Sequence, residues 1–303
     1  MRQSVLVTGA AGFVGRYVAQ AFENKGYQVH GLGWGKFPDF RDWGLTSWNE
    51  SEVSLESLVE FAGKPDVIVH CAGGSAVGYS IEHPRQDFCL TVDTTSHVLE
   101  YIRRHSPETR LVYPSTAAVY GQVESVPITE SASLKPVSPY GVHKLMAEDL
   151  CRLYATQFGL QIAIVRLFSI YGKGLRKQLL WDACQKFNRG ESTFFGTGEE
   201  IRDWLYVCDA AALLMMAEVH ASTACPVVNG GSGTGTNVAM ILNALALAFS
   251  VDIKPAFSSQ SKPGDPDALV ANIESAKSWG WLPQADCVQA VAEYAKWFLQ
   301  EGN

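Results

Sequence analysis

Three glycines near the start of the chain constrain its fold more than any other feature. Gly9, Gly12 and Gly15 form a G-x-x-G-x-x-G pattern in the stretch VTGAAGFVG, between an apolar β-rich run and a helical pattern. Glycines at such a junction allow a tight turn, let the backbone approach a pyrophosphate and let the helix pack close to the sheet. The pattern predicts a dinucleotide-binding strand–turn–helix unit, in which Phe13 and Val14 also contact the dinucleotide.

The first half of the chain repeats this alternation of strands and helices, as βαβ units in a parallel sheet do. Strands are predicted over 4–9, 28–33, 66–73, 110–116 and 161–168. Helices are predicted over 13–25, 55–62, 88–104 and 139–158. This order predicts an α/β fold with right-handed crossovers and a doubly wound parallel sheet of the Rossmann type.

The rhythm breaks after Tyr171 into longer connections that contain glycine and tryptophan. We expect residues 1–170 to form the dinucleotide-binding domain, and residues 171–204 and 236–303 to form a smaller C-terminal lobe that binds the substrate. A helical pattern near 207–218 and the run CPVVNGG favour a return of residues 205–235 to the first domain.

Composition narrows the class of function. The chain has 303 residues, a formal net charge of -7 and a pI near 5.5. This balance predicts neither a nucleic-acid nor a membrane partner. The start of the chain lacks a signal-peptide pattern, and the apolar run Met240–Phe249 is too short to cross a bilayer. Seven scattered cysteines with no C-x-x-C pair predict neither disulfides nor a metal site. We expect a cytoplasmic enzyme that acts on a small molecule.

The stretch SPYGVHK, residues 138–144, predicts an acid–base pair. Ser138 can cap a helix that begins at Pro139, which places Tyr140 and Lys144 one turn apart on the same helix face. A phenol has an ordinary pKa of about 10, but a neighbouring ammonium and an oxidised nicotinamide ring favour its phenolate. Tyr140 could therefore exchange a proton with a carbinol or carbonyl while Lys144 holds the nicotinamide ribose.

A third group should hydrogen-bond the same substrate oxygen. Ser115 and Thr116 lie at the carboxyl end of the strand predicted over 110–116, where open α/β sheets bind their ligands. One of these two hydroxyls is the candidate, and the other would be satisfied within the structure.

The end of the second predicted strand indicates which dinucleotide is bound. An acidic residue there usually accepts from the adenosine ribose and repels a 2′-phosphate, but this chain has Gly33, with Lys36 close behind. We therefore predict that NADP(H) is preferred and that NAD(H) is possible. In the alternative interpretation Lys36 is a solvated loop charge, and Asp39 or Asp42 serves the ribose.

These residues and five further stretches, in order along nearly the whole chain, resemble the extended short-chain dehydrogenase/reductase superfamily, in particular its nucleotide-sugar epimerases, dehydratases and 4-keto reductases. The further stretches are DVIVHCAG, YPSTAAVYG, VRLFSIYGKG, GTGEEIRDWLYVCD and KPGDPD.

The resemblance implies a role for each matching residue. Thr116 matches the family's catalytic Ser/Thr with Ser115 beside it, Tyr140 matches the acid–base and Lys144 its partner. Arg202 would contact the nucleotide diphosphate, which suits its bidentate guanidinium. The further cofactor-binding residues implied are Cys71, Ala72 and Gly73, and the further substrate-binding residues are Ser75, Ser169, Lys262 and Asp265. The resemblance also implies a homodimer that pairs the helices over 88–104 and 139–158.

The chain also departs from the family pattern. Ser169 and Thr91 stand where many members have asparagine, and Lys262 stands where an arginine is often seen. The acidic residue found near the adenine after the third strand is not evident in the stretch 43–49. These departures indicate that the substrate phosphate contacts are altered or moved.

We predict hydride transfer at a carbon, most plausibly C4, of a nucleotide-activated sugar. Thr116 is followed by Ala117 and Ala118, where related dehydratases commonly carry an acidic pair, so dehydration is disfavoured. Gly33 favours exchangeable NADPH and hence a 4-keto reductase. The alternative is a 4-epimerase of the UDP-glucose or UDP-N-acetylglucosamine type that retains NAD, as the stretch VRLFSIYGKG suggests. A third hypothesis, a non-catalytic protein that senses dinucleotides, is disfavoured because Tyr140 and Lys144 are both present.

Overall fold

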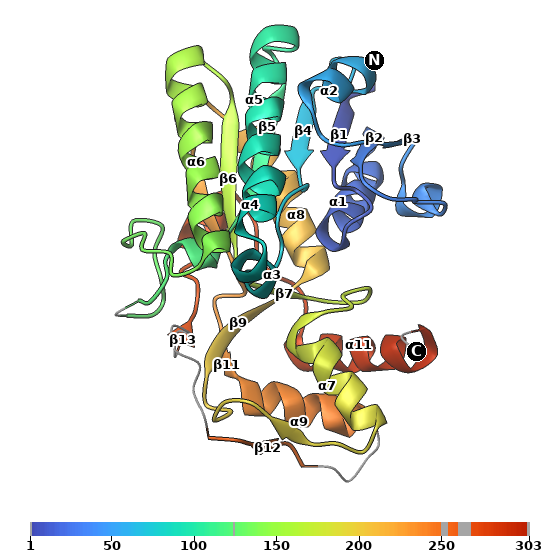
Figure 1. Cartoon of the computed structure of the whole chain (residues 1–303), viewed down its shortest axis with the longest axis vertical. Helices are drawn as coiled ribbons and strands as arrows, with labels where there is room; N and C mark the ends of the chain where they lie inside the picture. The colour runs from blue at the N-terminus through green and yellow to red at the C-terminus, as the bar shows by residue number, and fades with distance from the viewer. Residues whose placement is uncertain (1, 124, 250–253, 260–267, 302–303) are drawn as a thin grey trace.

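The computed structural model describes residues 2–123, 125–249, 254–259 and 268–301 (Figure 1). Seven parallel strands form its main sheet in the order β10-β6-β5-β4-β1-β2-β3. They are β1 (Ser4–Thr8), β2 (Gln28–Gly33), β3 (Ser47–Glu50), β4 (Val67–His70), β5 (Arg110–Thr116), β6 (Ile162–Leu167) and β10 (Val227–Gly230). The predicted doubly wound parallel sheet is confirmed. Its order reverses between β1 and β4, the switch point at which such sheets bind ligands.

Helices cover both faces of this sheet. α1 (Phe13–Asn24) packs against α8 (Val207–Ala217) on one face, and α5 (Thr94–His105) packs between α2 (Leu55–Phe61) and α6 (Pro139–Phe158) on the other. Successive side chains of β1 alternate between the two layers: Val5 and Val7 lie in the core under α1, and Leu6 lies in the core under α5. Strands buried on both faces explain the continuous apolar runs in the sequence.

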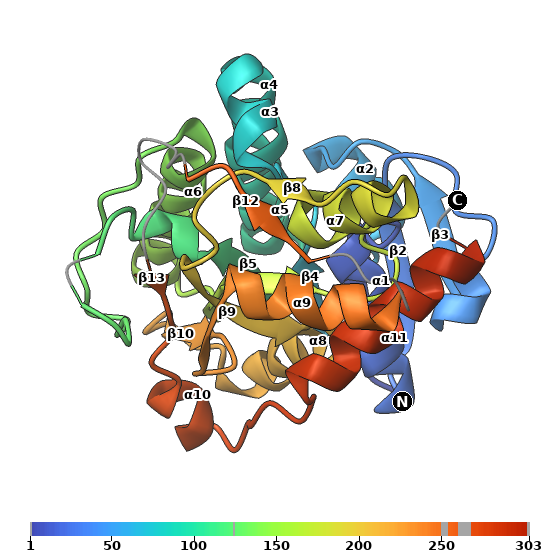
Figure 2. The same cartoon turned by 90° about the horizontal axis from the view of Figure 1, so that it is seen from below.

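A smaller lobe lies below the carboxyl ends of the main strands (Figures 1 and 2). Its sheet joins β9 (Ile201–Tyr206) to β7 (Ser169–Tyr171), β11 (Gly235–Asn237) and β13 (Ala268–Leu269), and β8 (Thr193–Phe194) pairs with β12 (Ala256–Phe257). Its helices are α7 (Gln178–Asn188), α9 (Val238–Ala248) and α11 (Cys287–Glu301).

We propose that the domain boundaries follow the predicted scheme, because α8 and β10 both lie within 205–235 and both join the main sheet. One segment departs from it. α10 (Glu274–Ser278) packs against β10, and Trp281 is buried in the core under α1 and α8. Part of the segment 236–303 thus returns to the main sheet, which the sequence pattern did not indicate.

The prediction of one continuous helix over 88–104 was wrong. The structure has α3 (Val77–Glu82), α4 (Pro84–Phe88), a π-helical turn over Cys89–Asp93 and then α5. Thr91 lies in that turn, and its hydroxyl oxygen accepts a hydrogen bond from the backbone N–H of Gly74 at 3.0 Å. π-helical turns of this kind are frequent at functional sites.

Strand β3 was missed because its four residues, SWNE, carry no apolar alternation. It follows a 3₁₀ turn over Phe40–Trp43 and pairs only with β2.

A buried ion-pair network attaches α6 to the sheet. Glu148 of α6 is fully buried and accepts from Arg166 of β6 at 2.8 and 3.0 Å and from Arg152 at 2.6 Å. Burial acts to raise the pKa of Glu148, but the hydrogen bonds and charges of Arg166, Ser115 and Arg152 outweigh it, so its pKa lies below the ordinary value. Because Arg166 is buried as well, at 2% exposed, the position of α6 depends on both Glu148 and Arg166.

We expect Glu148→Gln to lower the free energy of unfolding by about 3–5 kcal/mol, because it leaves a buried guanidinium without its carboxylate. Urea denaturation at neutral pH measures this loss. Since the folded-state pKa is depressed, the contribution of Glu148 is present above its unfolded-state pKa and is lost as pH falls through the folded value. Asp149→Asn is the matched control, because Asp149 is an exposed partner of Arg152. An equal loss in both variants would contradict the prediction.

Candidate active site

The glycine turn at the end of β1 is closely packed on all sides. Gly9 adopts φ +69°, and a Cβ there would lie 2.7 Å from the backbone nitrogen of Ala72. A Cβ on Gly15 would overlap the carbonyl oxygen of Gly9, so the first turn of α1 lies directly against the loop. Gly12 caps α1 with extended backbone and no side chain. This cradle fits a dinucleotide pyrophosphate, which needs close backbone approach at a helix N-terminus.

A cavity of 2070 Å³ extends from this turn to the second lobe. Such a volume exceeds the roughly 300–1,000 Å³ of an ordinary ligand pocket, so it has room for a dinucleotide and a second ligand. The predicted site residues that line it are Gly9, Gly12, Phe13, Val14, Gly15, Gly33, Cys71, Ala72, Gly73, Ser75, Ser115, Thr116, Tyr140, Lys144, Ser169 and Arg202. Lys262 and Asp265 lie outside the described residues.

The proposed acid–base group stands where α6 begins. The Ser138 hydroxyl accepts from the N–H of Gly141 at 3.2 Å, which caps the helix as predicted. The backbone N–H of Tyr140 donates to the Ser80 hydroxyl at 3.0 Å, and the Thr116 side chain at the end of β5 lies near enough to its phenol to lower the pKa of that phenol. The phenol is thereby held at the carboxyl ends of the central strands.

The ammonium of Lys144 is buried beside this phenol. It donates to the carbonyl oxygen of Pro114 at 3.0 Å and lies 4.9 Å from the centre of the Tyr113 ring. A Cβ on Gly73 would lie 3.6 Å from its Nζ, so the glycine leaves the ammonium open toward the dinucleotide loop. Burial lowers the pKa of Lys144 to about 8.

The pKa of Tyr140 itself is raised. Burial is the main cause, the hydrogen bond with Thr116 acts in the opposite direction, and the charge of Asp87 raises the pKa further. The phenol is therefore neutral in the protein alone at neutral pH. A cation bound beside it would favour the phenolate, as the sequence argument requires.

The structure places Ser115, which was predicted to act beside Thr116, in contact with α6. Its hydroxyl donates to Glu148 at 2.6 Å, and the residue is 4% exposed. Neighbouring side chains on a strand point to opposite faces, so Ser115 points toward α6 while Thr116 points to the cavity. Of the two predicted hydroxyls, Thr116 is the one in contact with Tyr140.

The prediction for Lys36 is not supported either. Lys36 is exposed and does not line the cavity. Gly33 has a packing reason to lack a side chain, because a Cβ there would lie 3.1–3.3 Å from Trp48 and from the backbone of Gly9. The missing carboxylate at this position therefore does not by itself indicate a 2′-phosphate.

Several cavity residues were missed by the sequence reasoning. Glu52, Val53 and Ser54 line the cavity just after β3, which corrects the expectation that no acidic residue follows the third strand. Trp34, directly after β2, also lines it and is 66% exposed. Glu52, Val53 and Ser54 were missed because β3 was not predicted and the acidic residue was expected within 43–49.

A second missed feature lies behind the acid–base pair. Asp87 is fully buried, and its Oδ2 lies 2.6 Å from Nδ1 of His143, which stands between Tyr140 and Lys144 on α6. Its charge raises the pKa of both Tyr140 and Lys144. The two residues are 56 positions apart, so only the packing of α4 on α6 reveals them.

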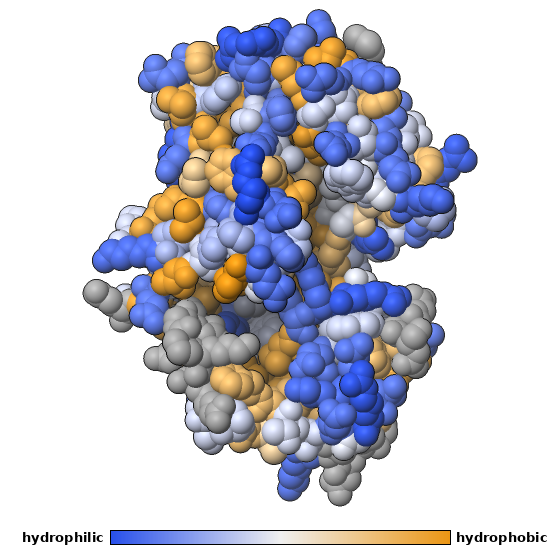
Figure 3. Space-filling model, viewed as in Figure 1, coloured by the Kyte–Doolittle hydropathy of each residue, from blue (hydrophilic) through white to orange (hydrophobic). Residues whose placement is uncertain are grey.

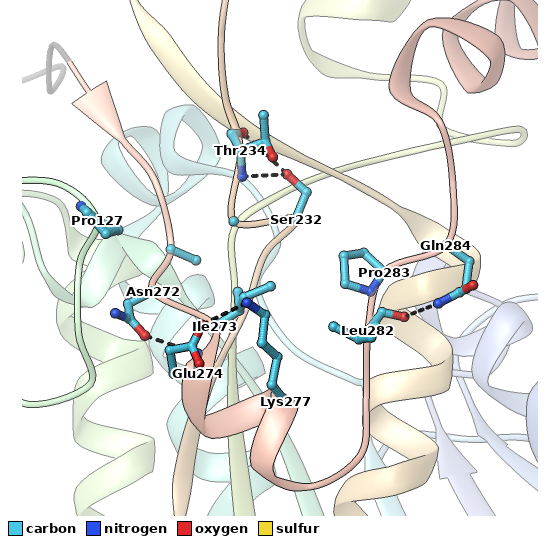
Figure 4. A pocket seen from close by; sticks show the side chains of 12 residues that line it. Pro127, Ser232, Thr234, Asn272, Ile273, Glu274, Lys277, Leu282, Pro283 and Gln284 are labelled. Carbon is cyan, nitrogen blue, oxygen red and sulfur yellow. Dashed lines mark hydrogen bonds and ion pairs between the residues drawn. The ribbon is translucent and has the colours of Figure 1, made fainter.

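A smaller pocket of 420 Å³ lies near α10, between Thr234, Asn272 and Gln284 (Figure 4). Its lysine, Lys277, is paired with Glu274 at 2.7 Å. The pocket contains none of the predicted site residues.

The described ranges contain no cluster of three or more His, Cys, Asp or Glu side chains able to hold a metal ion. Nor do they contain a helix long and apolar enough to cross a membrane.

We expect Gly15→Ala to weaken dinucleotide binding about tenfold to hundredfold, because the added methyl group forces α1 away from Gly9. Titration of the protein with the oxidised and reduced dinucleotides measures this loss. Gly78→Ala is the matched control, since Gly78 lines the same cavity and a Cβ there meets nothing within 4 Å. Unchanged affinity in Gly15→Ala would refute the assigned cradle.

Comparison with known proteins agrees with this site. The model of the NAD dependent epimerase/dehydratase family matches residues 5–229. The UDP-glucose 4-epimerase of Corynebacterium glutamicum is 30% identical over 313 residues, which cover 96% of this chain and 94% of that protein.

Solved structures share the whole fold. UDP-glucose 4-epimerase from Thermotoga maritima, solved with UDP-glucose, has a TM-score of 0.88 at 24% identity, covering 99% of this chain and 100% of its own. UDP-glucuronic acid 4-epimerase from Bacillus cereus, solved with UDP-glucuronic acid and NAD, has a TM-score of 0.87 at 25% identity, covering 98% and 99%. The chain belongs to the NAD dependent epimerase/dehydratase family, within the extended short-chain dehydrogenase/reductase superfamily that its motifs resemble.

Proposed function

We propose that this protein is a nucleotide-sugar 4-epimerase that acts on a UDP-hexose and retains NAD. The observation that carries the proposal is that Tyr140, Thr116 and the buried ammonium of Lys144 line one cavity that joins the glycine cradle to the second lobe. Full-length likeness to 4-epimerases supports epimerisation over the 4-keto reduction predicted from Gly33.

The glycine cradle and Lys144 would hold the dinucleotide, Gly9 and Gly15 at the pyrophosphate and Lys144 at the nicotinamide ribose. Bound NAD supplies the hydride acceptor and, on return, the hydride donor. Tyr140 accepts the proton of the sugar's C4 hydroxyl while Thr116 hydrogen-bonds the same oxygen. The ammonium of Lys144 stabilises the phenolate form in which Tyr140 accepts this proton.

Epimerisation then needs no external reactant. Tyr140 returns the same proton to the C4 oxygen after the keto sugar has turned its other face, so the net proton balance is zero. The cavity must therefore let the sugar rotate without releasing it, and its extension into the second lobe provides the space. Binding by the distant nucleotide would hold the intermediate during this rotation.

The residues at the end of the cavity that would hold the adenosine also favour NAD over NADP. Lys36 is exposed and is not among the residues that line the cavity, whereas Glu52, after β3, is one of them. A carboxylate near the adenosine disfavours a 2′-phosphate by like-charge repulsion. The second candidate, an NADPH-dependent 4-keto reductase, retains one observation in its favour, which is the lack of a carboxylate at Gly33.

We also propose a homodimer through α5 and α6. Val142, Met146 and Leu153 of α6 are 40%, 39% and 48% exposed, and their spacing of four and seven places them along one helix face. A helix pair with such an apolar face suits a self-complementary interface.

The test of the proposed function is to denature the purified protein, identify any released dinucleotide, and assay interconversion of UDP-glucose with UDP-galactose and of UDP-N-acetylglucosamine with UDP-N-acetylgalactosamine without added cofactor. We expect bound NAD and turnover, and a loss of about 10²–10⁴-fold in kcat in Tyr140→Phe with NAD still bound. Exchangeable NADPH, with reduction of a 4-keto sugar and no epimerisation, would establish the reductase instead.

Removing the hydroxyl of Thr116 and removing that of Ser115, both at the end of β5, should have different effects. We expect Thr116→Ala to lower kcat about tenfold to hundredfold with little loss of stability, because it removes a hydrogen bond to the reacting oxygen. Ser115→Ala should lower the free energy of unfolding by about 1–3 kcal/mol, since Glu148 loses a buried donor, and leave kcat nearly unchanged. Steady-state kinetics and urea denaturation on both variants check this, and the reverse pattern would refute the assignment.

A further inference from the structure

Lys177 is a cation that lines the cavity. It is half-buried at the start of α7, and its ammonium donates to the Ser75 hydroxyl at 2.7 Å and less closely to the Ser75 carbonyl at 3.4 Å. Across the ranges that the structure describes, no carboxylate lies within 4 Å of it. Burial lowers the pKa of Lys177, and no neighbouring charge offsets this effect.

Two other cations of the cavity wall have different partners. Lys186, also on α7, is paired with Asp182 at 3.1 Å. Arg176 lies over the rings of Trp181 and Trp297. A desolvated ammonium held only by neutral oxygens is costly, and an incoming anion would remove that cost.

The position of Lys177 indicates which part of the substrate it meets. Ser75 follows Gly73 by two residues, a chain distance of at most about 7 Å, and Gly73 faces the ammonium of Lys144. Lys177 therefore lies close to the proton-transfer site but is not part of it. In a nucleotide sugar, the group that lies next to the reacting hexose and carries negative charge is the diphosphate.

The backbone at this point is unusual. Gln178, the first residue of α7, adopts φ +67°, a left-handed conformation that residues other than glycine rarely adopt, and it too lines the cavity. Such strain concentrates at ligand-binding sites. It occurs here next to Lys177.

We propose that Lys177 binds the diphosphate of the nucleotide sugar, its ammonium moving from Ser75 to a phosphate oxygen when the substrate enters. This inference rests on the proposed function, because it requires a nucleoside diphosphate in the cavity. It adds a cation from the second lobe to the predicted contact of Arg202. It also accounts for altered phosphate contacts in a chain whose family motifs depart at Ser169 and Lys262.

Binding of nucleotides without a sugar tests the proposal. The full-length protein, loaded with its dinucleotide, is titrated calorimetrically with UDP, dTDP, GDP and CDP, and the tightest of these is compared with its nucleoside. In Lys177→Gln we expect the diphosphate to bind about tenfold to hundredfold more weakly, with nucleoside affinity and dinucleotide content unchanged. Lys177→Arg, which keeps a cation, should recover part of the loss.

Two controls separate this role from a structural one. Lys186→Gln removes an equal charge from the same helix and cavity, and should change the affinity little because Lys186 is already paired. Ser75→Ala removes the 2.7 Å hydroxyl contact between the lobes but leaves the ammonium and its 3.4 Å contact with the Ser75 carbonyl, and should bind the diphosphate at least as tightly as the unaltered protein.

Each other outcome overturns the proposal. A loss in Ser75→Ala equal to that in Lys177→Gln would make Lys177 a bridge between lobes, and unchanged binding in Lys177→Gln would remove it from the diphosphate site. A loss seen only with the complete nucleotide sugar would place the contact on the hexose. If the unaltered protein binds none of the four diphosphates, the proposed function itself fails.

Discussion

The contact on which the cavity depends is the close approach of three backbones around Gly9. The end of β1 meets the loop after β4 at Ala72 and the first turn of α1 at Gly15, with no room for a side chain at either contact. This packing occurs where the strand order of the sheet reverses. Because backbone N–H groups can approach a phosphate only where side chains are absent, the same constraint that packs the sheet also shapes the dinucleotide cradle.

Catalytic geometry depends on how α6 is attached to that sheet. Arg166 of β6 and Ser115 of β5 both bind Glu148, one turn of helix beyond Lys144. The buried carboxylate thus determines where Tyr140 and Lys144 lie relative to Thr116. Asp87, which contacts His143, adds a second buried charge behind the pair and raises the pKa of Tyr140. Structural and chemical roles are therefore divided between neighbouring residues of one strand and one helix.

The second lobe contributes charge and volume to the cavity, and the first lobe contributes the reacting groups. Lys177 and Arg202 line its side of the cavity, and Tyr140 and Lys144 line the other. Since Lys177 donates to Ser75 across the cavity, a ligand that attracts its ammonium also changes the link between the lobes.

The sequence by itself determined the doubly wound sheet, the glycine cradle and the pair of Tyr140 and Lys144. These depend on short-range patterns: apolar runs, glycines at a strand–helix junction, and residues one helical turn apart. The tertiary structure alone decided that Ser115 points to Glu148, that Glu52 reaches the cavity after an unrecognised β3, and that Lys177 meets Ser75. Those contacts join residues 33 to 102 positions apart or follow a strand without periodicity, so only the packed chain brings them together.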